Sequence, residues 1–126
     1  MPSLKDLGYK KKIDFSESRP WGRYDVLLDT NFTKVKIITV APGQRLSYQS
    51  HKHRQEQWIL VKGKLQVVRE DEDYTLDKIG DSFTILKGQK HRAWNKTDEI
   101  AQFIEVQTGE SFEEEDITRY EDDYER

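Results

Sequence analysis

The three histidines of this 126-residue sequence lie in two short segments whose spacing suits metal coordination. His51 and His53 stand two residues apart with Glu56 close behind, and His91 follows in the second segment. On a strand, side chains two residues apart point to the same face, so His51 and His53 could bind one ion together. Three neutral imidazoles and a carboxylate suit one divalent transition metal with a position left open for substrate. The predicted ligands are therefore His51, His53, Glu56 and His91.

Strand alternation alone does not decide whether the Glu56 side chain points to the same side as the histidines. An uninterrupted strand from His53 would turn Gln57, rather than Glu56, to the side of the histidines. A turn or bulge between Arg54 and Glu56 would reset the alternation, and a carboxylate is the better ligand for a divalent ion. We therefore predict Glu56 as the ligand and keep Gln57 as the alternative.

Further polar residues share faces with these candidates. Ser47 and Gln49 have the same alternation as His51, so on a regular strand they face the same cavity; the alternative is an exposed rim. Glu105 and Gln107 share one face of a strand expected over residues 101–107, and either face of that strand could point inward.

The elements that would position these residues are short and β-like. Apolar or alternating stretches at residues 35–40, 57–61, 65–69, 74–76, 82–86 and 101–107 are separated by Gly, Pro and acidic turns. This spacing, without helical periodicity, predicts an all-β sandwich or barrel. Ser111-Phe112-Glu113-Glu114 has a capping-box pattern, which predicts one short C-terminal helix over residues 115–120. Residues 1–19 are polar and are predicted to be an N-terminal arm preceding a single domain at residues 20–126.

Composition narrows the classes of function. With 34% apolar and 36% charged residues, the core is lean, which fits a barrel and would favour a homodimer that covers apolar surface. The net charge of −3 argues against a nucleic-acid partner, and the absence of cysteine excludes disulfides and thiolate ligands. No signal peptide or membrane-spanning apolar run is present, so no membrane partner and a cytoplasmic location are expected.

The two histidine segments resemble the paired motifs of the cupin superfamily. Gly80, Gly88, His91 and Asn95 match every interval of the second motif, with Leu86 standing where proline is usual. In the first motif, the interval from Glu56 to Gly63 matches, whereas His51 is preceded by two extra residues. The resemblance implies a double-stranded β-helix, or jelly-roll, barrel.

Within the cupins, the chain is much more narrowly similar to the type II phosphomannose isomerase domain. This domain usually follows a guanylyltransferase domain in a bifunctional mannose-1-phosphate guanylyltransferase/mannose-6-phosphate isomerase; here it is expected as a stand-alone domain. The resemblance covers roughly residues 19–126. It rests on the stretches at residues 19–22, 46–54, 56–58, 91–95, 104–109 and 115–124.

The resemblance implies a metal-dependent isomerase that interconverts mannose 6-phosphate and fructose 6-phosphate through an enediolate. Glu56 or Glu105 would then be the catalytic base, and Arg92 would bind the phosphate, with Arg54 and Arg126 as alternatives. The ion would be zinc, with manganese, iron, cobalt or nickel as alternatives. Two other functions stay open: a non-catalytic sugar-phosphate-binding cupin and a metal-dependent oxygenase. The expected substrate-binding residues are Ser47, Gln49, Arg92 and Gln107.

Overall fold

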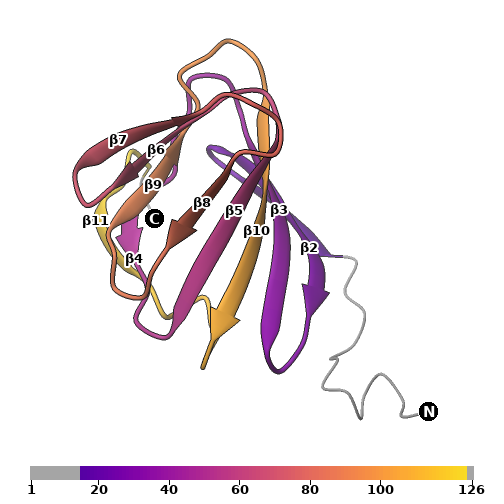
Figure 1. Ribbon diagram of the computed structural model, residues 1–126, viewed down its shortest axis with the longest axis vertical. Coiled ribbons are helices and arrows are strands. Elements are labelled where there is room, and N and C mark those ends of the chain that lie inside the picture. Colours follow the sequence, from indigo (N-terminus) through magenta and orange to yellow (C-terminus); the bar gives the residue numbers. More distant parts are fainter. Residues whose placement is uncertain (1–14, 125–126) are drawn as a thin grey trace.

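The protein is built from two antiparallel β-sheets that face each other, as the computed structural model shows for residues 15–124 (Figure 1). In spatial order, the six-stranded sheet contains β1 (Phe15–Arg19), β2 (Gly22–Asp29), β3 (Thr33–Val40), β10 (Ala101–Gly109), β5 (Arg54–Lys62) and β8 (Ser82–Ile85). The five-stranded sheet contains β11 (Thr118–Glu121), β4 (Tyr48–Ser50), β9 (His91–Trp94), β6 (Leu65–Arg69) and β7 (Glu72–Leu76). Within this range there is no helix, and so no helical segment that could cross a membrane.

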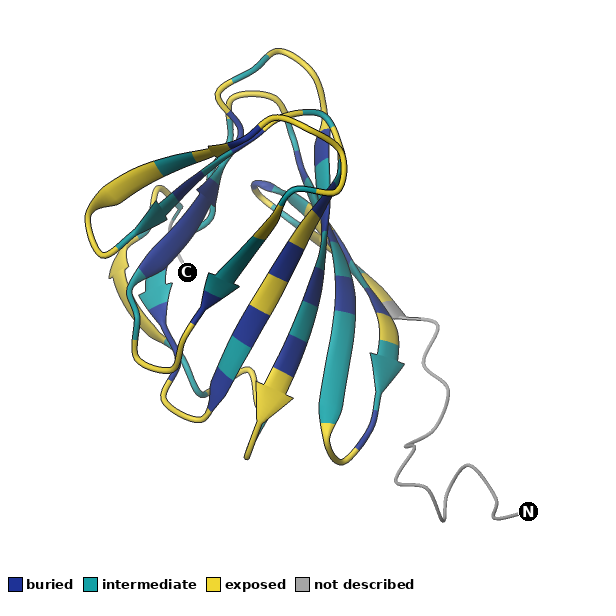
Figure 2. Ribbon diagram, viewed as in Figure 1, coloured by how far each residue is buried: buried dark blue, intermediate teal, exposed yellow. Residues whose placement is uncertain are grey.

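The long central strands alternate between buried residues and residues that are partly or fully exposed. On β5, Glu56, Trp58 and Leu60 are buried, whereas Gln57 and Ile59 between them are exposed. Figure 2 shows this alternation as bands along β5 and β10. One face of each strand therefore points into the space between the two sheets, as a period of two requires.

Strand register divides the inner face of the six-stranded sheet into an apolar and a polar half. The apolar half contains a row of paired residues from β3, β10 and β5, namely Ile38, Phe103 and Leu60. Two residues further along β10, the paired residues are Lys36, Glu105 and Trp58, followed by Gln107 beside Glu56. All of these residues are buried. Because buried polar groups are costly unless they have partners, the polar half is where a site is expected.

The expected N-terminal arm is in part a strand. Residues 15–19 form β1, which pairs along its whole length with β2 of the same chain. Pro20 and Trp21 are the turn between these strands, and Gly22 has φ +149° with its Cα facing the carbonyl oxygen of Thr39. A Cβ there would lie 2.0 Å from that oxygen, so the turn requires glycine. The remainder of the arm, residues 1–14, lies outside the described residues.

The expected C-terminal helix is wrong. Ser111 Oγ accepts from the N–H of Glu113 only two residues on, at 3.3 Å, and Glu114 reaches away to Lys36 instead of back to Ser111. The reciprocal bonds of a capping box are therefore not made. Two turns follow, and the chain then forms β11 on the edge of the five-stranded sheet beside β4.

Candidate metal site and the adjoining cavity

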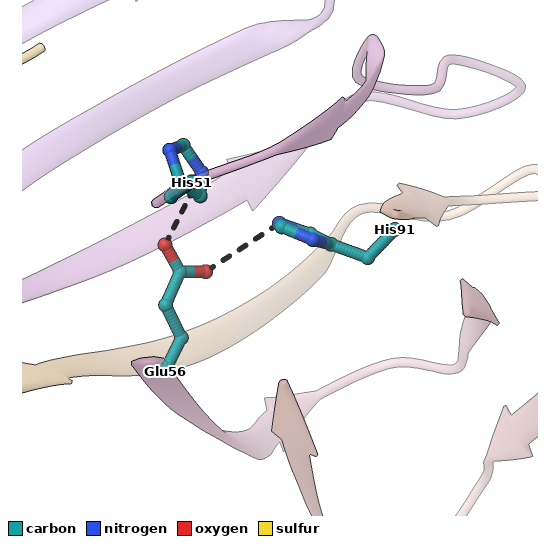
Figure 3. A group of neighbouring side chains, drawn as sticks. All are labelled: His51, Glu56 and His91. Atoms are coloured by element: carbon teal, nitrogen blue, oxygen red, sulfur yellow. Dashed lines mark ion pairs between the residues drawn. The ribbon is translucent and has the colours of Figure 1, made fainter. Parts of the chain in front are cut away.

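Three side chains from separate parts of the fold converge at the polar end of the barrel (Figure 3). His51 follows β4 directly, Glu56 lies on β5 and His91 begins β9. Their potential ligand atoms all lie within 4.8 Å of one another. His51 Nε2 is 3.5 Å and His91 Nε2 is 3.8 Å from the two carboxylate oxygens of Glu56. All three residues are buried.

Both imidazoles are oriented as metal ligands usually are. His51 Nδ1 lies 2.6 Å from the backbone oxygen of Asp116, and His91 Nδ1 lies 2.9 Å from that of Gln89. A proton on Nδ1 would be donated to these carbonyls, which leaves the Nε2 lone pairs directed at Glu56. His91 Nε2 is buried and has no hydrogen-bond partner within residues 15–124.

The electrostatics keep both histidines available for a cation. Burial lowers the pKa of each imidazole to about 4, so both are neutral at neutral pH. Neutral imidazoles and an ionised carboxylate are the forms that bind a divalent ion. Two histidines and one glutamate are also a donor set found in catalytic zinc sites. The side chains of His51, Glu56 and His91 therefore fit a divalent metal ion.

A buried arginine lies beside these donors. Arg54 Nε donates to Glu56 Oε2 at 2.9 Å, and Trp58 Nε1 donates to Glu56 Oε1 at the same distance. Arg54 Nη2 lies 3.2 Å from His51 Nε2. This guanidinium compensates the negative charge of Glu56, and Nη2 would have to turn away for His51 Nε2 to bind a metal ion.

His53, which we expected to share the ion, lies outside this group. Its side chain is 53% exposed, and Nδ1 faces Glu110 Oε2 at 3.5 Å. The alternation argument fails because residues 51–53 form a bend between β4 and β5 rather than a strand. Strand alternation begins anew at Arg54, which turns Glu56 inward and leaves Gln57 exposed, accepting a hydrogen bond from Thr84.

A cavity of about 140 Å³ adjoins His51 between the two sheets. Three of the residues that we expected to face the site, Ser47, Gln49 and Glu105, line it. Burial, followed by the negative charge of Glu56, raises the pKa of Glu105 to about 7. Gln107 does not line the cavity, but its Nε2 donates to Glu105 Oε2 at 2.9 Å.

Arg92 does not line this cavity. Because it follows His91 on β9, its side chain points to the opposite face, where Nε donates to Leu46 O at 3.0 Å and Nη1 to Glu121 Oε2 at 3.0 Å. Arg126 lies outside the described residues. Sequence reasoning missed three basic residues that do line the cavity: Arg19, Lys36 and Arg119. For Lys36 a signal existed, since it has the same strand alternation as the apolar Ile38 and Val40.

The sequence also matches a known family and several known proteins. The sequence family described as the C-terminal part of mannose-6-phosphate isomerase matches residues 9–122. The chain is 44% identical over 108 residues to the xanthan biosynthesis protein XanB of Xanthomonas campestris pv. campestris, covering 86% of this chain and 23% of that protein. It is 40% identical over 121 residues to a mannose-1-phosphate guanylyltransferase of Escherichia coli K12, covering 96% and 25%. The chain thus spans about a quarter of the length of these relatives.

The fold also matches solved structures. A protein from Silicibacter pomeroyi DSS-3, described as a sugar phosphate isomerase from a cupin superfamily, superimposes with a TM-score of 0.59. The two chains are 22% identical, and the match covers 68% of this chain and 59% of the other. At that identity the likeness shows the fold alone. The predicted all-β cupin architecture is confirmed.

Proposed function

Because the chain belongs to the family of the mannose-6-phosphate isomerase C-terminal domain, we propose that it is a metal-dependent isomerase of sugar phosphates. The substrates would be mannose 6-phosphate and fructose 6-phosphate. One observation carries the proposal: a cavity adjoins the group of His51, Glu56 and His91 and is also lined by a second carboxylate, Glu105. An aldose–ketose isomerase needs both a site for charge stabilisation and a separate group that moves a proton.

In this proposal, His51, Glu56 and His91 hold the ion, and zinc fits this donor set. When bound, a divalent ion supplies stabilisation for the negative charge that develops on the substrate oxygens at C1 and C2. We do not assign the role of catalytic base to Glu56, because a carboxylate that binds a cation is a weak proton acceptor.

Glu105 is the residue that we assign to proton transfer. It takes a proton from C2 of the aldose to give the enediolate and returns it to C1, while the proton of the C2 hydroxyl moves to the oxygen at C1, which gives the ketose. The amide of Gln107 holds Glu105 Oε2 and so fixes the direction of the carboxylate. Ser47 and Gln49, joined by a 3.0 Å hydrogen bond, line the cavity and offer polar groups to the sugar hydroxyls.

A coupled assay on metal-loaded protein tests the proposal. Mannose 6-phosphate should be converted to fructose 6-phosphate, and Glu105→Gln should lower kcat by about 100-fold or more while the metal content stays unchanged. Gln57→Ala, on the exposed face of β5, is the matched control and should leave kcat unchanged. Saturable binding without turnover would favour the non-catalytic cupin, and oxygen consumption by the iron-loaded protein would favour the oxygenase.

We also propose that the protein forms a homodimer. The outer face of the six-stranded sheet carries a row of three paired isoleucines, Ile37, Ile104 and Ile59. Ile59 is 37% exposed, and covering such a row would stabilise a chain with a lean core. Sedimentation of Ile59→Glu should show a monomer with normal metal content, whereas an unchanged dimer would exclude this face. The cytoplasmic location stays a prediction.

A further inference from the structure

Basic side chains gather around the cavity next to the candidate metal site. Among the described residues, its lining includes Arg19, Lys36, Arg54 and Arg119, from β1, β3, β5 and β11. The acidic residues in the lining are Glu105 and Glu114. The chain as a whole has a net charge of −3, so this excess of positive charge is local to the cavity. Such a cavity attracts an anionic ligand.

Lys36 is buried on the inner face of the six-stranded sheet, with 4% of its surface exposed. Its Nζ lies 4.4 Å from the centre of the Tyr24 ring on β2 and 2.7 Å from Glu114 Oε1. Burial of an ammonium group is costly unless an anion lies next to it. The position beside Lys36 Nζ is therefore an anion position, which Glu114 occupies.

Arg54 provides a second buried cation with an unused donor. Its Nε and Nη2 face Glu56 and His51, whereas Nη1 is buried without a hydrogen-bond partner in the described part of the chain. Since Arg54 lines the cavity, a ligand oxygen there could accept from this nitrogen. Guanidinium groups bind phosphate oxygens through several donors at once.

Glu114 differs from the cations that it contacts, because its own side chain is 55% exposed. It lies on the loop between β10 and β11 and bridges Lys36 and Lys34, the second at 3.4 Å. Such a carboxylate can turn into water when another anion takes its place beside Lys36, which keeps the buried ammonium paired. A phosphate, with nearly two negative charges and three acceptor oxygens, would satisfy the buried cations better than one carboxylate.

The order of the strands separates Lys36 from Glu56 of the candidate metal site, whereas Arg54 contacts Glu56 and His51 directly. Lys36 on β3 leans toward Tyr24 on β2, whereas Glu56 lies on β5, with Glu105 of β10 between them. Two strand spacings are roughly 10 Å. This span suits a six-carbon sugar with its carbonyl end at His51 and Glu56, its reacting carbons at Glu105, and its phosphate at Lys36.

We propose that Lys36, Arg54 and Arg119 form the binding site for the substrate phosphate, and that Glu114 occupies this site in the ligand-free protein. The inference deepens the proposed function, on which it rests for the identity of the sugar. It replaces Arg92, which points away from the cavity, as the residue that recognises phosphate.

Calorimetric titration of the full, metal-loaded chain tests the proposal, with mannose 6-phosphate, mannose and glucuronate as probes. Lys36→Gln should raise the Kd for mannose 6-phosphate by at least about tenfold, because it removes a buried charge partner. Glu114→Gln should lower that Kd by about two- to tenfold, because it removes the competing carboxylate. Lys34→Gln is the matched control: it loses the same charge and also faces Glu114, yet lies outside the cavity lining, so the Kd should stay within about threefold.

Several results would overturn the proposal. These are a folded Lys36→Gln protein with unchanged Kd, a Glu114→Gln protein that binds more weakly, or glucuronate bound as tightly as mannose 6-phosphate. If Lys36→Gln does not fold, Glu114→Gln decides alone, since its side chain is half exposed. Binding that depends on Lys36 without any turnover would refute the isomerase but not the phosphate site. Turnover with an unchanged KM in Lys36→Gln would refute the phosphate site but not the isomerase.

Discussion

Replacing His53 and His91 separately should have very different effects on metal affinity. His91→Gln removes one of three buried donors that lie within 4.8 Å of one another. Changing a residue that only orients a metal ligand already weakens binding by about 10–100-fold. The loss of a ligand should therefore raise the Kd by more than about 100-fold, equivalent to about 2.8 kcal/mol.

His53→Gln should leave the Kd nearly unchanged. The side chain is 53% exposed, and the contact that the structure shows for its ring is an exposed pair with Glu110. The free energy of unfolding should change by no more than about 0.5 kcal/mol, as for other surface substitutions. Because both variants replace histidine with glutamine, which keeps much of the side-chain volume, they form a matched pair.

The assay is competition between the protein and a chromophoric zinc chelator at pH 7.5, with a thermal melt of each variant to confirm folding. The Kd of the wild type and the Kd of His53→Gln should be nearly equal, and both should be far lower than the Kd of His91→Gln. If His53→Gln loses as much affinity as His91→Gln, the loop between β4 and β5 must close onto the ion and the three-donor site is incomplete. If a folded His91→Gln protein keeps full affinity, the site itself is wrong.

Three further predictions follow from the contacts of the site. Burial lowers the pKa of His51 and of His91 from 6.5 to about 4, so the unfolded chain binds more protons in this range, and the metal-free protein should lose on the order of 3 kcal/mol of stability per histidine as pH falls from 6.5 to 4. Glu105, whose pKa is raised to about 7, works in the opposite direction, so the test uses Glu105→Gln. Urea unfolding of this variant at pH 7.5 and 5 with no change in midpoint would contradict the prediction. Gly109→Ala should destabilise the fold by roughly 1–3 kcal/mol, because φ is +143° and a Cβ would lie 2.3 Å from a backbone oxygen. Gly43→Ala, with open space around it, is the control and should cost less in the same thermal melts. Asp116→Ala removes the carboxylate that accepts from two backbone N–H groups beside His51, so zinc affinity should fall by about 10–100-fold with the fold retained; an unchanged Kd would show that this loop does not position the imidazole.

Local patterns were enough to predict the fold class and the core of the candidate site. Strand periodicity and Gly or Pro turns depend on neighbouring residues alone, so the alternation of β5 and β10 is visible in the sequence. The sequence also favours Glu56 over Gln57 as the ligand, and the structure turns Glu56 inward for a partly different reason. The sequence argument needs a turn or bulge between Arg54 and Glu56 to shift the strand alternation. In the structure the alternation is interrupted earlier, by the bend at residues 51–53.

What the sequence could not provide depends on contacts between distant segments. Ser111-Phe112-Glu113-Glu114 has the local signature of a helix start, yet Glu114 pairs with Lys36 some 78 residues away, and the next residues join β4 as a strand. A weak local preference is overruled when the tertiary structure offers a buried cation to a carboxylate and an unpaired strand edge to the backbone.

In the candidate site, too, some features depend on local sequence and others on contacts between distant segments. That histidine and glutamate are present at ligand-like spacing was determined by the sequence, because residue type and spacing are local. That His53 points to solvent, that Arg92 faces away and that Lys36 lines the cavity was decided only by the tertiary structure. Each depends on where a strand begins and which strand lies beside it, since a shift of one residue reverses the face to which every side chain points.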